Sequence, residues 1–288
     1  DYATVLSRQF RHLVSKNRPQ GAFYMFRFSV LDIKMVSCTI KPNEEINLNT
    51  QTRAEFDQYA RDYFREMSHP LRDLIDPRGH YFIELKARIL EKIARRHFGE
   101  DRSIRLVDVG TGLGLFEKFL SPAFANILAV DLSLEMLKVA RMTNPLTSAG
   151  SLYLQANAFH LPVKDASADL IFMSCVLHHL EKEEIALTLA ELARICSPRG
   201  LIVFFEHNPF NPFTQWVVKT TPLDRNARLV TFGDLTRKAE NAGIHIIDRE
   251  FFLYGTREVG RIIDRWLPGL NNIPPGGQFA LIGKKSGH

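Results

Sequence analysis

The chain has 288 residues, of which 45% are hydrophobic and 24% charged, and these are the proportions of a globular protein with a sizeable core. The net charge of +5 is spread along the chain, and the densest basic stretch, "KARILEKIARRH" (residues 86–97), has the spacing of a solvated helix face rather than of a nucleic-acid footprint. No apolar run reaches the roughly 20 residues of a membrane span, and the three cysteines are too scattered for a disulfide framework or a zinc site, so we expect a protein of the reducing cytoplasm without a bound metal.

Residues 1–50 are basic and show no regular pattern. A targeting extension, a disordered arm and a poorly chosen start all fit this segment, and the sequence leaves the three alternatives open. The rest, residues 51–288, is expected to form a single domain that begins with a helical lid over residues 51–100. In the lid, "RAEFDQYARDYFREM" has the spacing of an amphipathic helix, and "YFIELKARILEKIARRHF" (residues 81–98) predicts a longer helix that ends at Gly99.

Beyond residue 100, strand-like and helix-like segments alternate. We predict strands over residues 104–109, 126–131, 152–157, 168–174, 201–207, 244–252 and 278–285. We predict helices from about Leu113, over residues 133–142 with Ser133 as the N-cap, and over residues 183–196 and 231–243. This alternation is typical of a doubly wound, mostly parallel α/β sheet, in which ligands bind at the carboxyl ends of the strands.

The stretch "LVDVGTGLGLFEKFL" (residues 106–120) places three glycines between an apolar strand and a helix-like segment. Glycine has no Cβ and tolerates positive φ, so a ligand can approach the backbone closely here. Asp131 ends the next predicted strand, where a carboxylate can accept two hydrogen bonds from ribose hydroxyls. The bend therefore favours a nucleoside ligand, and a tight turn with no ligand is the alternative.

Two positions near this bend indicate the kind of nucleoside. A dinucleotide fingerprint requires a third glycine where Leu115 stands. Asp108, beside the bend, would repel a pyrophosphate but attract a cationic amino-acid group, directly or through water. We therefore expect a positively charged nucleoside, and S-adenosylmethionine is the candidate that meets these requirements.

Four stretches in this order, "VDVGTGLG", "AVDLS", "QANAFHLPVKDASADLIFMSCVLHHL" and "ELARICSPRGLIVFFEHNP", resemble the class I S-adenosylmethionine-dependent methyltransferases of the small-molecule (type 11/12-like) branch. The likeness covers roughly residues 56–285. In addition, "FDQYARDY", "EHNPFNP" and "IPPGGQ" resemble motifs of a bacterial subgroup marked by EHNPxNP. The resemblance implies a seven-stranded Rossmann-like sheet with the last strand antiparallel, and a cofactor-binding core over residues 101–207 that uses S-adenosylmethionine.

The same resemblance implies which residues surround the cofactor. Asp131 would bind the ribose, and Tyr63 would reach the methionine carboxylate. Asn157 stands where the family has an acid that accepts the adenine amino hydrogen, and its carbonyl can accept the same bond. Arg199 in "SPRG" replaces a glycine of the family and would strain that turn. The full implied set is Asp108, Gly110, Thr111, Gly112, Gly114, Asp131, Leu132, Asn157, Ala158, Phe159, Ser174 and Tyr63.

Polar side chains at the ends of the fourth and fifth strands are candidates for chemistry. "VLHHL" and "FFEHNPFNP" supply most of them. Adjacent strand residues face opposite ways, so Glu206 and His207 can enter one pocket only where the strand bends. Structural hydrogen bonds, turn capping and helix packing are the alternatives to these roles. The catalytic candidates are His207, His179 and Glu206, and the acceptor-binding candidates are Asn208, Tyr59, His178 and Gln278.

Together these features predict transfer of a methyl group from S-adenosylmethionine to a small-molecule acceptor, with a slight preference for oxygen as the receiving atom. Residues 208–288 would shape an acceptor pocket that suits an apolar group. The aromatic and apolar side chains expected to line it are Phe210, Phe213, Trp216, Trp266 and Leu267. The rival hypotheses are an enzyme that uses a modified form of this cofactor and a non-catalytic binding or regulatory module. No "NPPY"-type or "DPPY"-type run follows the fourth strand, which disfavours nucleic-acid bases as acceptors.

Overall fold

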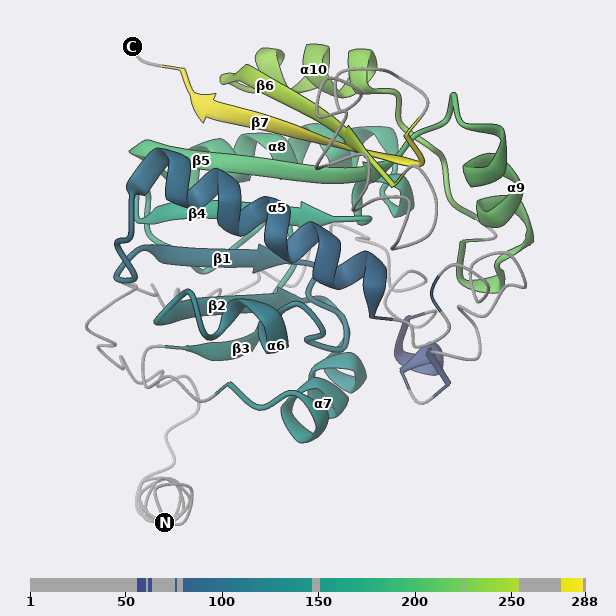
Figure 1. Ribbon diagram of the computed structural model, residues 1–288, viewed down its shortest axis with the longest axis horizontal. Coiled ribbons are helices and arrows are strands. Elements are labelled where there is room, and N and C mark those ends of the chain that lie inside the picture. The colour runs from purple at the N-terminus through teal and green to yellow at the C-terminus, as the bar shows by residue number, and fades with distance from the viewer. Residues whose placement is uncertain are drawn as a thin grey trace, which may run out of the picture.

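A seven-stranded sheet organises the chain (Figure 1). The computed structural model describes residues 56–60, 62–63, 76, 80–146, 151–224, 226–253 and 276–286. The strands are β1 (Arg105–Val109), β2 (Asn126–Asp131), β3 (Leu152–Gln155), β4 (Ala168–Ser174), β5 (Cys196–His207), β6 (Ile244–Phe252) and β7 (Gln278–Lys285). Their spatial order is β3-β2-β1-β4-β5-β7-β6. β1 to β5 pair in parallel, whereas β7 is antiparallel to β5 and β6, which confirms the predicted fold class.

Helices cover both faces of the sheet (Figure 1). They are α5 (Tyr81–Phe98), α6 (Glu117–Leu120), α7 (Leu134–Thr143), α8 (Lys182–Ile195), α9 (Pro212–Thr220) and α10 (Phe232–Asn241), with short 3-10 turns η1 (Leu177–His179) and η2 (Pro222–Asp224). α5 and α6 pack on one face, α8 and α10 pack on the other, and α9 lies beyond the carboxyl ends of the strands. Within the described ranges, no helix is both long and apolar enough to cross a membrane.

Strand alternation decides which side chains meet which helices. In β1, Leu106 is buried with residues of α5 and α6, and Val107 is buried with residues of α8. In β5, Phe205 faces the α5 layer and Phe204 faces the α8 layer, and both are fully buried. Because both faces are covered, the central strands are near-continuous apolar runs, and this is why the sequence reveals their positions.

Most element boundaries agree with the prediction. The predicted bounds of β2, β4, β6, β7 and α5 are confirmed to the residue. Ser133 caps α7 as predicted, since its Oγ accepts a hydrogen bond from the Met136 N–H at 3.1 Å. β3 ends at Gln155, earlier than predicted, and Asn157 instead forms an isolated bridge with His160.

The N-terminal part of the chain is described only in small pieces. Residues 56–59 are helical, in agreement with the amphipathic helix predicted there. The predictions for residues 1–50, and those for Trp266 and Leu267, fall outside the described residues.

The helix after β1 starts later than predicted. We expected it from about Leu113, but α6 begins at Glu117. Gly112 and Gly114 have φ values of 55° and 66°, and such left-handed residues cannot continue a right-handed helix. A Cβ on Gly114 would also overlap the Tyr153 hydroxyl, so this position requires glycine. The glycines therefore keep the loop irregular and delay the helix.

β5 starts earlier than predicted. We expected a turn at "SPRG" and a strand from Leu201, whereas the strand begins at Cys196, which pairs with Ala168. The pairing register shifts before Leu201, so the residues between form a bulge inside the strand. The strain expected at Arg199 is not observed, because Arg199 is exposed and does not have a positive φ.

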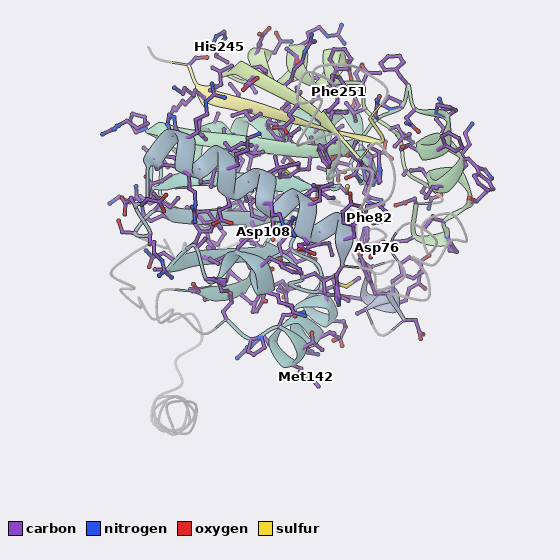
Figure 2. All side chains as sticks on the ribbon, viewed as in Figure 1. Asp76, Phe82, Asp108, Met142, His245 and Phe251 are labelled. Carbon is purple, nitrogen blue, oxygen red and sulfur yellow. The ribbon has the colours of Figure 1, made fainter. Side chains whose placement is uncertain are left out.

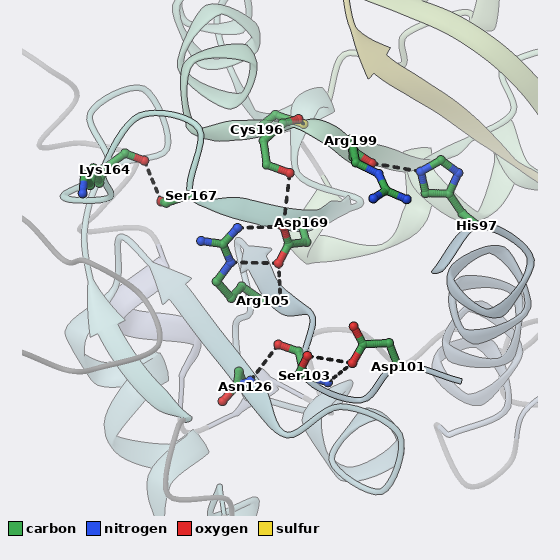
Figure 3. A network of polar contacts seen from close by, with 11 residues as sticks. His97, Asp101, Ser103, Arg105, Asn126, Lys164, Ser167, Asp169, Cys196 and Arg199 are labelled. Carbon is green, nitrogen blue, oxygen red and sulfur yellow. Dashed lines mark hydrogen bonds and ion pairs between the residues drawn. The ribbon is translucent and has the colours of Figure 1, made fainter. Parts of the chain in front are cut away.

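A polar network joins three strands at the edge opposite to their carboxyl ends (Figure 3). The Asp169 carboxylate in β4 accepts hydrogen bonds of 2.7–3.0 Å from the backbone N–H and the guanidinium of Arg105 in β1. Ser197 Oγ in β5 donates to the same carboxylate at 3.1 Å. Burial raises the pKa of Asp169, but these hydrogen bonds and the Arg105 charge outweigh burial and lower the pKa. The network thus holds the amino ends of these strands together.

Replacing Asp169 with alanine is expected to lower the free energy of unfolding by about 1.5–3 kcal/mol, because Arg105 and Ser197 lose a charged hydrogen-bond partner. Urea unfolding at pH 7 measures this loss. Asp248→Ala is the matched control, since Asp248 pairs with Arg96 at 3.6 Å on the exposed surface, and such pairs contribute less than about 1 kcal/mol.

The same comparison at low pH tests the cause. Because the folded-state pKa of Asp169 is lowered, its stabilising contribution is present above the unfolded-state pKa, which is about 3.9. The contribution is lost as the pH falls through the folded-state pKa. The difference between the wild type and Asp169→Ala should therefore shrink in acid, and a difference that stays constant would contradict this account.

Candidate functional site

A cavity of about 770 Å³ opens at the carboxyl edge of the sheet. Its walls come from the segments after β1 and β3, from the ends of β2, β4 and β5, and from α5 and α9. Phe56 and Tyr63 contribute from the N-terminal side. Small-molecule and cofactor sites have volumes of about 300–1,000 Å³. The cavity is therefore large enough for a cofactor together with part of a second molecule.

One end of the cavity is built around Asp131, at the end of β2. Its Oδ2 accepts a hydrogen bond from the Gly112 N–H at 2.7 Å, and its Oδ1 accepts one from the Ser133 N–H at 2.8 Å. Burial raises the pKa of Asp131, and these two hydrogen bonds oppose the rise. Each carboxylate oxygen keeps a second lone pair. Asp131 can therefore hold the glycine loop in place and still accept hydrogen bonds from a ligand.

The backbone of the glycine loop borders open space at Gly112. A Cβ placed on this residue would meet no atom within 4 Å, and its φ of 55° disfavours any other residue. A ligand can therefore approach the chain closely at this point.

Asp108 lies away from the cavity wall. It faces the same side as Leu106, toward α5 and α6, in the interior of the molecule (Figure 2). There it lies beside Glu117, and each of the two residues is only 1% exposed. Burial, and then the repulsion of Glu117, raise the pKa of Asp108 well above its usual range, and burial raises the pKa of Glu117. The pair is therefore suited to sharing a proton rather than to carrying two negative charges.

Lys86 reaches the opposite side of the cavity from α5. Its ammonium donates to Ser174 Oγ at 2.8 Å and to Cys175 Sγ at 3.3 Å, at the end of β4. The prediction of a solvated basic face is wrong for Lys86, which is 5% exposed. Lys86 lies one helical turn from Leu90, on the buried stripe of α5. The remaining basic residues of this stretch that are exposed as predicted are Arg88, Lys92, Arg95 and Arg96.

Cys175 combines a strained backbone with an activated thiol. Its φ of 57° is in the left-handed region, which a residue with a side chain rarely adopts. Burial raises the pKa of its thiol, but the positive charge of Lys86 and the contact with His207 outweigh burial and bring the pKa to about 6. The thiol is therefore largely ionised at pH 7.

His178 lies between two carboxylates in the cavity wall. Its Nδ1 is 2.6 Å from Glu206 Oε2, and its Nε2 is 3.7 Å from Asp224 Oδ1. Burial lowers the pKa of His178, but the two carboxylates outweigh burial and raise it to about 10. His179 packs beside it with ring centroids 4.2 Å apart, and burial together with the His178 charge lowers the pKa of His179 to about 3. At pH 7 the first imidazole is therefore charged and the second is neutral.

Glu206, near the end of β5, contacts both η1 and the His178 ring. Its Oε1 accepts hydrogen bonds from the backbone N–H groups of Val176 and Leu177, at 3.2 and 2.9 Å. Burial raises the pKa of Glu206, but the His178 charge and hydrogen bond outweigh burial and lower it. Glu206 thus positions η1 and His178, while its neighbour His207 faces the cavity, as strand alternation requires.

Comparison with known proteins finds a family similar to the middle of the chain, which carries part of this site. Residues 107–204 match the sequence model of a family described as "Methyltransferase domain". This part of the chain is similar to a methyltransferase domain. The matched range includes the glycine loop, Asp131 and the paired histidines, and together with the sheet topology it indicates the S-adenosylmethionine-dependent class I type.

Two curated relatives are similar over part of their length. The malonyl-[acyl-carrier protein] O-methyltransferase of Hamiltonella defensa is 33% identical over 106 residues, which are 37% of this chain and 39% of the relative. The demethylmenaquinone methyltransferase of Renibacterium salmoninarum is 30% identical over 128 residues, which are 42% of this chain and 52% of the relative. The alignments thus span about half or less of each relative.

The fold is shared with solved methyltransferase structures. The magnesium protoporphyrin IX methyltransferase of Synechocystis, solved with bound S-adenosylhomocysteine, superposes with a TM-score of 0.58 over 81% of this chain and 98% of that one. The sequence identity is 15%, so this likeness concerns the fold alone.

The structure brings most of the predicted cofactor residues to the wall of one cavity. Asp108 and Gly114 are the predicted residues that do not line it. Those that do are Tyr63, Gly110, Thr111, Gly112, Asp131, Leu132, Asn157, Ala158, Phe159 and Ser174. The open backbone at Gly112, the spare lone pairs of Asp131 and the apolar wall at Leu132 and Ala158 fit a nucleoside such as S-adenosylmethionine.

The predicted acceptor-side residues divide into two groups. His178, His179, His207 and Gln278 line the cavity, and Glu206, Asn208 and Tyr59 do not. Asn208 is fully buried, where its Nδ2 donates to Gly276 O and its Oδ1 accepts from the Phe210 N–H. These contacts match the alternative of turn capping. Tyr59 packs in a small cluster with Ala60, which matches the alternative of helix packing.

The structure describes three of the aromatic residues predicted to line the acceptor pocket. Of these three, Phe213 lines the cavity. Phe210 and Trp216 are 60% and 52% exposed and are not part of its wall.

Several polar cavity residues were missed from the sequence, namely Lys86, Glu184, Asn211, Thr214, Thr221 and Asp224. The buried position of Lys86 follows from its place on the apolar stripe of α5, so helical periodicity could have revealed it. Asp224 belongs to a short turn after α9 and reaches the histidines only through the tertiary fold. No local pattern in "TTPLDRN" marks it.

Substituting Lys86 with methionine is expected to raise the pKa of Cys175 from about 6 toward the ordinary thiol value of about 8.5, because the burial penalty then lacks its main compensating charge. The rate of alkylation by iodoacetamide, followed at the Cys175 peptide by mass spectrometry across pH 5–10, measures the shift. Cys196, whose pKa burial raises to about 11, is the internal control and should stay unreactive below pH 9. An unchanged Cys175 profile in the variant would contradict the role of Lys86.

Proposed function

We propose that this protein transfers the methyl group of S-adenosylmethionine to a small-molecule acceptor with an apolar part. The observation that carries the proposal is the continuity of the cavity. One end presents the glycine loop and Asp131, and the other presents His178, His207 and the wall formed by α9. A nucleoside cofactor and a second molecule can therefore meet inside one cavity.

S-adenosylmethionine supplies a methyl group on a positively charged sulfur, and the neutral thioether is a good leaving group. The protein's task is then mainly to align the two molecules and to exclude water. Asp131 and the Gly112 backbone fix the cofactor end, as their hydrogen bond of 2.7 Å already holds the loop in shape. Phe56 and Tyr63 line the same cavity from the N-terminal side.

The acceptor end supports the preference for an apolar molecule. Apolar side chains provide most of the lining there, and the histidines, Gln278, Asp224, Asn211 and Thr214 are among the polar residues interspersed with them. The apolar lining residues are Phe82, Ile83, Phe213, Val217, Val218, Leu223 and Leu253. The names of the two curated relatives point to malonyl-[acyl-carrier protein] and demethylmenaquinone as acceptors to test first.

His207 is the side chain that we assign to accept a proton from the acceptor. It borders the cavity, and its Nδ1 lies 3.3 Å from Gln278 Nε2, which orients the ring. Its ring centroid is 5.1 Å from that of His178. A positioned base of this kind contributes about 10²–10⁴-fold to a rate. His179 borders the same space and is the second candidate.

Further parts of the proposal rest on the sequence. We infer membership of the bacterial subgroup marked by "EHNPFNP", a helical lid from residues 51–100, and an acceptor-shaping role for residues 208–288. The absence of paired cysteines in the sequence favours a cytoplasmic location.

Two substitutions separate binding from chemistry. Asp131→Ala is expected to weaken S-adenosylmethionine binding by about tenfold or more, because one or two hydrogen bonds to a charged group are lost. His207→Ala should bind the cofactor with unchanged affinity and lower turnover by about 10²–10⁴-fold. Calorimetry measures binding, and transfer of radiolabelled methyl to metabolite extracts and to the two acceptor classes above measures turnover.

His245→Ala is the matched control, since His245 is exposed on β6 at the far edge of the sheet (Figure 2). It should leave binding and turnover unchanged. Wild-type protein that binds the cofactor but methylates nothing would favour the non-catalytic module, and wild-type protein that does not bind it would refute the proposal.

A further inference from the structure

The side chains of His178, His179 and Asp224 form a cluster in the cavity wall. The Nε2 atoms of His178 and His179 lie 3.7 and 3.6 Å from Asp224 Oδ1. One ligand atom from each of the three residues lies within 4.8 Å of the others, and all three residues border the cavity. Contacts of this length are too long for hydrogen bonds. The donor atoms therefore converge without being joined to one another.

We propose that His178, His179 and Asp224 bind one divalent transition-metal ion of the zinc class, with an open coordination position toward the cavity. Bonds of about 2.0–2.2 Å to such an ion place two tetrahedral ligands roughly 3.4 Å apart. The observed spacings are slightly wider, so a small side-chain adjustment completes the site. Catalytic zinc sites characteristically have three protein ligands and one open position.

A second observation points to a ligand at this place. His178 is 1% exposed, and its Nε2 has no hydrogen-bond partner among the described residues. A buried polar atom without a hydrogen-bond partner is costly, and a metal ion that displaces the Nε2 proton would supply the missing one. The other ring nitrogen of His178 is held by Glu206 at 2.6 Å. A carboxylate behind a histidine in this way fixes the ring and strengthens it as a metal ligand.

The backbone holds the ligands in place before any ion binds. The His178 carbonyl accepts a hydrogen bond of 2.8 Å from the Arg228 N–H, which ties η1 to the segment after η2. The Asp224 carbonyl accepts one of 2.9 Å from the Ala227 N–H. The Phe56 ring meets His179 edge-on at 5.1 Å. The two carboxylates of Glu206 and Asp224 also supply the negative charge that a divalent cation requires.

The donor types select the metal. Two imidazoles and one carboxylate suit zinc, cobalt, iron or nickel, whereas magnesium and calcium require mainly oxygen ligands. The scattered cysteines that disfavoured a zinc site from the sequence are not involved, since the ligands are histidines and an aspartate.

The role of the ion rests on the proposed function. An ion with an open position toward the acceptor end would bind an acceptor oxygen and favour its deprotonated form. The chemical class of acceptor is then a molecule with a hydroxyl or carboxyl oxygen next to an apolar body. Methyl transfer to oxygen follows from this arrangement, whereas an amine acceptor would not need the ion.

Titration of the full, tag-free and chelator-treated chain tests the site with metal alone. Zn²⁺ in calorimetry and Co²⁺ in visible absorption should each bind at one ion per chain, and Co²⁺ should give the intense d–d bands of a low-coordinate site. Mg²⁺ at the same concentration should not compete. Absence of saturable binding by Zn²⁺ and Co²⁺ would overturn the proposal.

Variants locate the ion. His179→Ala and Asp224→Asn should each weaken Co²⁺ binding by more than tenfold, and Glu206→Gln should weaken it by about 10–100-fold through His178. His245→Ala should bind Co²⁺ as the wild type does. Circular dichroism and thermal melting of each variant identify loss of fold. Wild-type affinity in folded His179→Ala and Asp224→Asn would overturn the assignment, because the ion would then lie elsewhere.

Cofactor calorimetry on the same samples keeps the two proposals separate. Protein that binds S-adenosylmethionine and methylates an acceptor equally well with and without the metal would refute the role of the ion and leave the proposed function standing. Protein that binds Co²⁺ at these residues but binds no S-adenosylmethionine would support the metal site and refute the proposed function.

Discussion

The carboxylate of Asp131 is the constraint on which the site depends. It ends β2 and accepts one backbone N–H from the glycine loop and one from the start of α7, at 2.7 and 2.8 Å. Two separate segments are thereby fixed against the same pair of oxygens. The N–H groups of Gly110 and Thr111 also donate to the Val130 carbonyl, at 2.8 and 2.9 Å. The geometry of the glycine loop therefore follows from contacts with the last two residues of β2.

The acidic residues of β1, β2 and β5 take different roles because their side chains point in different directions. Asp108 lies two residues after Leu106 in β1, so its side chain points to the same face of the sheet, toward α5 and α6, where it lies beside Glu117. Asp131 ends its strand and remains available to the cavity. Glu206 points below the cavity and His207 points into it. Whether a strand residue supports the site or can touch a ligand therefore depends more on the direction in which its side chain points than on its residue type.

Much of the fold could be predicted from the sequence because the central strands are buried on both faces and are therefore nearly continuous apolar runs. The glycine loop and Asp131 were also evident, since both belong to one local pattern. The predicted start of α6 was wrong because the hydrophobic pattern carries no information about the positive φ values of Gly112 and Gly114. Lys86 and Asp224 were missed because their partners lie in segments that are distant along the chain.

Ser133, the N-cap of α7, connects three parts of the structure. Ser133 Oγ accepts from the Met136 N–H and also donates to the Asp57 carboxylate at 2.5 Å, while the Ser133 N–H is bound to Asp131. One serine thus joins the N-terminal helix, the first turn of α7 and Asp131. Loss of the Asp57 contact would remove a partner from the residue that caps α7, so the position of the N-terminal helix and the stability of the first turn of α7 are thermodynamically coupled.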